Sequence, residues 1–214
     1  MNTVEFIEKN KIICICRKVY GEDLLKLAHA LYDGGIRMME VTFDQGDPDC
    51  IAKTSEAIKL LCAEFGSDMK FGAGTVLNEE QVEAARAAGA EYIISPNTKP
   101  AVIRKTKELG MVSIPGAMTP TEIIGAHEAG ADFVKLFPTV RLGLAYIKDI
   151  LGPINNVKLI GTGGLNEENL KDYLDLGFAG AGISGRLVDK DLRMKGDYAQ
   201  LTARAAKFME IAGV

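Results

Sequence analysis

Lys135 has the sequence surroundings that point most directly to covalent chemistry. It lies in the middle of residues 132–138, an apolar run that is typical of a short strand and ends at a proline. Alternation along a strand places Phe133, Lys135 and Phe137 on one face. Burial between aromatic rings lowers the pKa of a lysine, and a neutral primary amine can attack a carbonyl carbon. The sequence therefore predicts Lys135 as a catalytic nucleophile.

A second ionisable residue, Glu40, lies inside the apolar run 38–43, with Thr42 on its face of the strand. Two interpretations are open. Glu40 and Lys135 could form a buried structural ion pair, or Glu40 could be a general acid and base beside the amine. We favour the second, because ionisable groups with perturbed pKa values gather at active sites.

Three glycine-containing segments could bring the backbone close to a ligand. Residues 71–75 form a strand of small residues, which is typical of ligand approach or of tight packing. Residues 160–165 and 179–185 follow late strands, and the backbone N–H groups of such corners can bind an anion, although glycines there can also simply turn the chain. We expect a phosphate site. The predicted ligands are Gly163, Gly164, Gly182, Ser184 and Gly185.

Arg17 and Thr162 are further candidates, because both end a predicted strand. Arg17 could clamp a carboxylate or a phosphate, or it could be an ordinary solvated strand end. We assign both residues to substrate binding. His29 and His127 lie within predicted helices and receive no role.

A repeated pattern in the chain predicts the elements that position these residues. Apolar runs of strand length alternate with stretches of helical period, and several of these stretches start near a capping residue and stop before a glycine. The predicted strands are residues 12–17, 38–43, 70–75, 92–96, 111–115, 133–138, 157–162 and 180–184. The predicted helices are residues 22–33, 50–64, 78–88, 98–109, 119–129, 142–151, 166–176 and 197–212.

Eight alternating units favour one α/β domain, residues 1–214, folded as a (β/α)₈ TIM barrel of parallel strands. An open, doubly wound sheet is the rival, but it seldom needs eight units. A short amphipathic helix over residues 3–9 could cover one end of the barrel. Chemistry in such barrels takes place at the C-terminal ends of the strands, where the candidate residues fall.

The composition narrows the function classes. A net charge of −4 gives no sign of a nucleic-acid or anionic-membrane surface. The four cysteines form no C-x-x-C pair and only two histidines occur, so we expect no metal site. The first residues lack a signal-peptide pattern, and no run of 18 apolar residues occurs. We therefore expect a cytoplasmic protein with reduced thiols that acts on small molecules.

Several motifs, in their order along nearly the whole chain, resemble the 2-keto-3-deoxy-6-phosphogluconate (KDPG) and 4-hydroxy-2-oxoglutarate (KHG) aldolases, which are small class I aldolases. The motifs are residues 34–36 (Gly-Gly-Ile), 39–42 (Met-Glu-Val-Thr), 72–77 (Gly-Ala-Gly-Thr-Val-Leu), 94–96 (Ile-Ser-Pro), 114–116 (Ile-Pro-Gly), 133–138 (Phe-Val-Lys-Leu-Phe-Pro) and 162–164 (Thr-Gly-Gly).

The resemblance implies a role for several residues and a reaction. Lys135 would form a Schiff base with pyruvate, and Glu40 would move protons. Thr75 and Pro96 would line the pyruvate pocket. The glycines at 163–164 would hold the phosphate of a 2-keto-3-deoxy sugar acid, which is cleaved to pyruvate and an aldehyde such as glyceraldehyde 3-phosphate. It further implies a homotrimer that needs no cofactor and no metal.

Three departures from the family pattern affect the choice of substrate. Asp44 stands where the family commonly has an arginine that contacts the substrate carboxylate, so Arg17 could replace that contact. Residues 139–141 (Thr-Val-Arg) replace the usual Ala-Glu after the proline. Residues 95–97 and 180–184 are closer to the 6-phospho-2-dehydro-3-deoxygalactonate aldolases. A galactonate-type aldolase is therefore an alternative, and a non-catalytic barrel that binds a sugar phosphate is another.

Overall fold

Strands and helices alternate along the whole chain, and the computed structural model describes residues 1–214. The strands are β1 (Ile12–Cys16), β2 (Met38–Thr42), β3 (Lys70–Gly74), β4 (Tyr92–Ile94), β5 (Val112–Ile114), β6 (Gly116–Ala117), β7 (Val134–Leu136), β8 (Leu159–Thr162) and β9 (Gly180–Ile183). The helices are α1 (Thr3–Asn10), α2 (Gly21–Asp33), α3 (Cys50–Phe65), α4 (Glu79–Ala87), α5 (Pro100–Glu108), α6 (Pro120–Glu128), α7 (Thr139–Leu151), α8 (Leu170–Asp175), α9 (Lys190–Met194) and α10 (Tyr198–Ala212).

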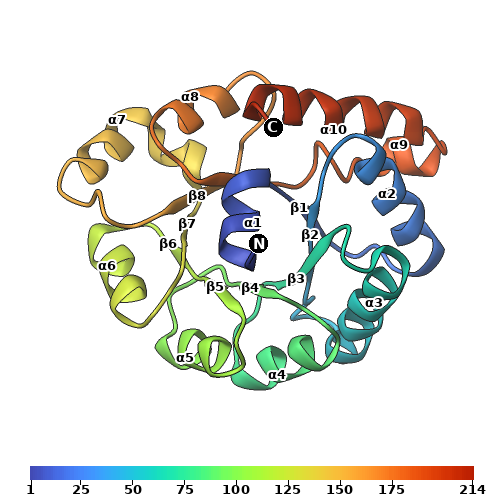
Figure 1. Ribbon diagram of the computed structural model, residues 1–214, viewed down its shortest axis with the longest axis horizontal. Helices are drawn as coiled ribbons and strands as arrows, with labels where there is room; N and C mark the ends of the chain where they lie inside the picture. Colours follow the sequence, from blue (N-terminus) through green and yellow to red (C-terminus); the bar gives the residue numbers. More distant parts are fainter.

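All nine strands are parallel and form one sheet that curls into a barrel inside a ring of helices (Figure 1). The strand order is β5-β4-β3-β2-β1-β9-β8-β7-β6. Only Pro115 separates β5 from β6. Strand β7 pairs with β6, where Phe137 N donates to Ala117 O at 3.0 Å, and Phe133 N, just before β7, donates to Ser113 O of β5 at 3.3 Å. The predicted (β/α)₈ barrel is confirmed. Its fifth strand is divided because proline has no N–H for the ladder.

Two hydrophobic clusters show which way the strand residues face. Ile13, Met38, Tyr92 and Phe133, which lie at or near the strand starts, pack in the barrel interior within a cluster of nine buried residues. Their chain neighbours pack against the helices instead, as alternation requires. The N-terminal end of the barrel is therefore filled with apolar side chains.

The short helix α1 covers this apolar end, as the sequence predicts, and it lies across the middle of the ring in Figure 1. Its Ile7 is fully buried among the interior residues. Because this end is closed, a ligand can reach the barrel interior only from the opposite end, at the C-terminal ends of the strands.

Some predicted helix details are wrong. Thr98, predicted to begin the helix over residues 98–109, lies before α5. Lys99 is the N-cap residue there, and the Thr98 hydroxyl donates to Gly116 O at 2.9 Å. Helix α7 begins at Thr139, three residues earlier than expected, and it is kinked at Gly143. The sequence analysis also missed α9. No helix combines the length and apolarity needed to cross a bilayer.

Candidate active site

Lys135 lies on β7 with its side chain in the barrel interior. The residue is 4% exposed, and its amine lies 5.0 Å from the centroid of the Phe137 ring. Burial lowers the pKa of Lys135, and the positive charge of Arg17 lowers it further, while the negative charge of Glu40 opposes both. Burial outweighs the attraction, so the neutral, nucleophilic form of this amine is more accessible than that of a surface lysine.

Glu40 reaches the same interior from β2 and is 1% exposed. Burial raises the pKa of Glu40, although the charges of Lys135 and Arg17 lower it. Its Oε2 atom is buried without a hydrogen-bond partner, and the carboxylate forms no ion pair with Lys135. The two side chains do not satisfy each other as a structural ion pair would, so each is free to exchange a proton with a bound ligand.

The two glycines of β3 have different neighbours. A Cβ atom on Gly74 would lie 2.7 Å from Cδ of Glu40, whereas a Cβ atom on Gly72 would lie 2.2 Å from Cε2 of the buried Tyr92 ring. The missing side chain of Gly74 therefore leaves space for the Glu40 carboxyl group, and that of Gly72 leaves space for the Tyr92 ring. Both glycines thus allow a side chain to pack closely on β3, which is the tight-packing explanation of the small-residue strand.

Thr75 and Pro96 follow β3 and β4 at the open end of the barrel, and both are partly exposed. Thr75 comes directly after Gly74, beside the Glu40 carboxyl group. The Pro96 backbone packs so closely on Gly116 that a Cβ there would lie 2.4 Å from Pro96 O. Since Gly116 is the register partner of Lys135, Pro96 lies near the strand segment that carries Lys135.

A cavity of about 550 Å³ opens after β8, beside the end of β7. It is lined by Pro138, Val140, Arg141, Gly163 and Gly164. Both glycines have positive φ angles (98° and 86°), and a Cβ on Gly164 would lie 2.8 Å from Cβ of Val140. Glycine is thus needed at 164 for conformation and for space.

Thr162 lies at the end of β8 and is 5% exposed. Its backbone N–H donates to the Thr139 hydroxyl at 2.7 Å, which joins β8 to the first residue of α7. Because Thr162 directly precedes the glycine pair, this bond fixes one side of the cavity.

The other predicted phosphate ligands, Gly182, Ser184 and Gly185, do not line this cavity. Ser184 Oγ donates to Ile15 O at 3.2 Å, and a Cβ on Gly182 would lie 2.8 Å from the Thr162 hydroxyl oxygen. These contacts join the β9 segment to β1 and to β8.

Arg17 and Asp44 stand at the rim of the open end. Arg17 is exposed just after β1, and its charge lowers the pKa of both Glu40 and Lys135, so it lies within electrostatic reach of both. Asp44 forms an ion pair with Lys18 at 2.7 Å, and this contact holds the pKa of Asp44 below its usual value. The Asp44 carboxylate is therefore paired with a lysine in the loop that follows β1.

Two residues of the site were missed by the sequence analysis. Arg141 is an exposed cation on the wall of the 550 Å³ cavity. Its only sequence signal is the departure from the family pattern after Pro138. Gln45 donates to Thr75 O at 2.7 Å, and an isolated glutamine in a loop carries no signal of such a contact.

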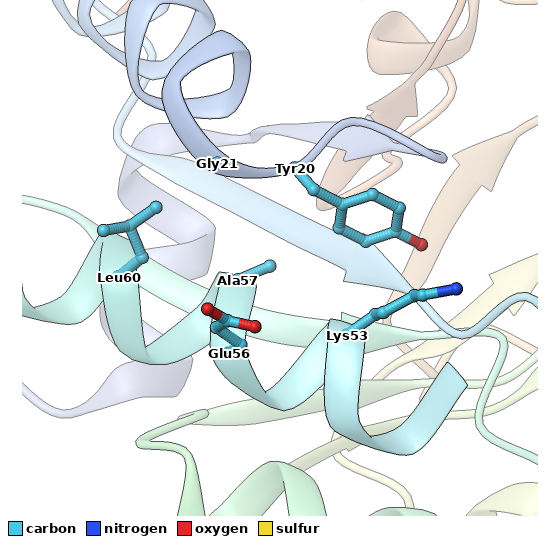
Figure 2. Close-up of a pocket in the computed structure, with 6 residues that line it drawn as sticks. All are labelled: Tyr20, Gly21, Lys53, Glu56, Ala57 and Leu60. Carbon is cyan, nitrogen blue, oxygen red and sulfur yellow. The ribbon is translucent and has the colours of Figure 1, made fainter. Parts of the chain in front are cut away.

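A second cavity of about 240 Å³ lies outside the barrel, between α2 and α3. In Figure 2 the ring of Tyr20 and the side chain of Lys53 reach toward each other at one end of it. None of the predicted site residues lines this cavity, so we place the chemistry at the barrel mouth. No group of three or more His, Cys, Asp or Glu side chains could hold a metal ion.

Comparisons with known proteins place the whole chain in one family. The family model described as KDPG and KHG aldolase matches residues 4–204. The chain is 36% identical over 211 residues to the 2-dehydro-3-deoxy-phosphogluconate aldolase of Treponema pallidum, covering 98% of this chain and 97% of that protein. It is 32% identical over 199 residues to the 2-dehydro-3-deoxy-6-phosphogalactonate aldolase of Escherichia coli, covering 92% of each.

A solved structure shows the same fold with a covalent intermediate. The KDPG aldolase of Legionella pneumophila, captured with pyruvate as a carbinolamine, has a TM-score of 0.84 and 29% sequence identity. The match covers 96% of this chain and 97% of that one. With the family model spanning nearly the whole chain, this protein belongs to the KDPG and KHG aldolase family of carbon–carbon lyases.

Proposed function

We propose that this chain cleaves a 2-keto-3-deoxy sugar acid to pyruvate and an aldehyde through an imine on Lys135. The observation that carries the proposal is the amine itself. The Lys135 amine is buried and its pKa is lowered. It shares the barrel interior with the Glu40 carboxyl group without forming an ion pair with it, and it faces the open end of the barrel.

In the proposed mechanism, the neutral Lys135 amine attacks the C2 ketone and forms a carbinolamine, which loses water to give a protonated imine. The imine withdraws electrons, so the C3–C4 bond breaks to an enamine of pyruvate and an aldehyde. Glu40 takes the proton of the C4 hydroxyl and later returns a proton to the enamine carbon. Water then hydrolyses the pyruvate imine and frees the amine.

The two ends of the substrate would be held by different loops. We assign the keto-acid end to Arg17, Thr75 and Pro96, since these follow β1, β3 and β4 near Glu40 and Lys135. We assign the far end to Thr162 and to the cavity beside Gly163 and Gly164. Backbone N–H groups there, with the Arg141 guanidinium, suit a phosphate group. We therefore propose a 6-phosphorylated substrate. We keep Gly182, Ser184 and Gly185, on β9 and directly after it, as proposed phosphate ligands, since a Cβ on Gly185 would meet no atom within 4 Å.

A panel of keto-deoxy acids tests the proposal directly. Pyruvate release is measured by coupling to lactate dehydrogenase, for both C4 epimers, each with and without a 6-phosphate. We expect the phosphorylated gluconate-type acid to give the highest kcat/KM. Preference for the other epimer would make this a galactonate-type aldolase, and no pyruvate from any acid would overturn the proposal.

Arg141→Gln tests the assignment of the phosphate end. Losing a charge-assisted contact should raise KM for a phosphorylated substrate about tenfold, and KM for 4-hydroxy-2-oxoglutarate, which has no phosphate, should stay unchanged. Arg104→Gln, an equal change on the exposed face of α5, is the control and should alter neither. Equal effects of Arg141→Gln on both substrates would contradict the assignment.

We further propose, from family membership, that the chain forms a homotrimer and works in the cytoplasm. All four cysteines are free thiols, as expected in a reducing compartment. Light scattering of the purified protein measures the oligomeric state, and a mass other than three chains would contradict the trimer.

A further inference from the structure

Thr75 has a backbone conformation that a threonine rarely adopts. Its φ angle is +57°, and only two other non-glycine residues in the chain have a positive φ. A β-branched residue is strained there, and such strain persists only where the surroundings impose it. Thr75 directly follows Gly74, whose missing Cβ leaves room for the Glu40 carboxyl group. The strain is therefore located beside the proposed catalytic acid and base.

Two glutamines bind the backbone at and just after Thr75. Gln45, in the loop between β2 and α3, donates through Nε2 to Thr75 O at 2.7 Å. Gln81 on α4 in turn donates through Nε2 to Gln45 Oε1 at 3.0 Å. Its own Oε1 accepts from Leu77 N at 2.7 Å. The two amides thus hold the backbone of residues 75–77 from one side.

Both glutamines are held in place by the surrounding structure. Gln81 is 3% exposed, and its backbone N–H donates to the Asn78 side chain at the start of α4. Gln45 itself is exposed, but the residue before it, Asp44, is tied to Lys18 at 2.7 Å. The loop that carries Gln45 is therefore fastened to the loops that follow β1 and β3.

We propose that Gln45 and Gln81 are positioning residues for the keto-acid end of the substrate. By holding the Thr75 carbonyl, they keep the Thr75 amide and hydroxyl in one orientation at the barrel mouth, next to Glu40. In this chain the segment after β2 therefore acts on the substrate indirectly, through Thr75, since Asp44 is occupied by Lys18. The inference rests on the proposed function, because it assigns Thr75 to the keto acid.

Gln45→Glu is the sharpest test, because it keeps the shape and the acceptor for Gln81 but replaces the donor to Thr75 O by an oxygen. Adduct formation is followed by borohydride reduction at increasing pyruvate concentrations. We expect the half-saturating pyruvate concentration to rise about fivefold or more, the loss typical of one hydrogen bond, with the maximal amount of adduct retained. Gln45→Ala should give a smaller rise in the same direction, because it removes the donor without adding repulsion.

The controls separate positioning from general damage. Gln200→Glu, the same change on the exposed face of α10, should leave the pyruvate dependence unchanged. Inhibition by inorganic phosphate, which reports on the far end of the site, should be the same in wild type and both Gln45 variants. Unchanged pyruvate dependence in both variants would overturn the inference. So would an equal weakening of pyruvate binding and of phosphate inhibition. If the wild type forms no adduct, the proposed function fails instead.

Discussion

Lys135→Met is expected to lower kcat/KM for keto-acid cleavage by at least on the order of 10⁴-fold, as loss of a covalent nucleophile does in other enzymes. Methionine has a similar length and is apolar, so it can fill the space between β7 and the Phe137 ring without forming an imine. Pyruvate release in the coupled assay measures the effect. A variant that kept a tenth of wild-type activity would contradict the assignment of the nucleophile.

The same variant should not lose stability. The pKa of Lys135 is lowered in the folded protein, so near neutral pH the unfolded chain binds this proton more readily and the lysine favours unfolding. Methionine removes that effect, and the thermal midpoint should be equal or higher. Lys158→Met is the matched control, because Lys158 also lies over a phenylalanine, Phe133, at 5.8 Å, but at the closed end of the barrel, where it pairs with Glu8. It should retain activity.

Glu40→Gln is expected to lower kcat by roughly 10²- to 10⁴-fold, the range for loss of a positioned acid and base. Glutamine keeps the shape over Gly74 but can neither take the C4 hydroxyl proton nor return it. The pH profile gives a second readout. Because burial raises the pKa of Glu40, wild-type kcat should fall as the pH drops through that raised value, and this limb should be missing from the variant.

The stability of Glu40→Gln follows from the same pKa. A carboxyl group whose pKa is raised in the folded state destabilises the protein increasingly as the pH rises above its unfolded value of about 4.3. The variant should therefore gain thermal stability relative to wild type from acid to neutral pH. Glu56→Gln, on the exposed side of α3, should change neither kcat nor this trend. An unchanged kcat in Glu40→Gln would remove Glu40 from the mechanism.

Strand patterns in the sequence predict the fold well because alternation is a local property. The side-chain directions of Phe133, Val134 and Lys135 follow from a period of two, and the barrel confirms them. The split of the fifth strand was not predicted. At Pro115 the chain changes from pairing with β4 to pairing with β7, and this change follows from the closed sheet, not from the local sequence.

Contacts between side chains from different strands could be predicted only in part. The sequence leaves open whether Glu40 pairs with Lys135, because the answer depends on how far apart β2 and β7 lie across the barrel. The glycine corners after β8 and β9 have similar composition, yet only Gly163 and Gly164 line the 550 Å³ cavity. The hydrogen bonds from Gln81 to Thr75 join helix α4 to two loops, and no single stretch of sequence carries their signal.

Mapping a reduced pyruvate adduct tests the central claim most directly. The intact protein is incubated with pyruvate, reduced with borohydride, digested and examined by mass spectrometry. We expect a single modified peptide carrying the adduct on Lys135, with labelling that persists at a pH where a surface lysine is too protonated to react, because burial lowers the pKa of this amine. An unmodified Lys135 at saturating pyruvate, or an adduct on another lysine, would contradict the account.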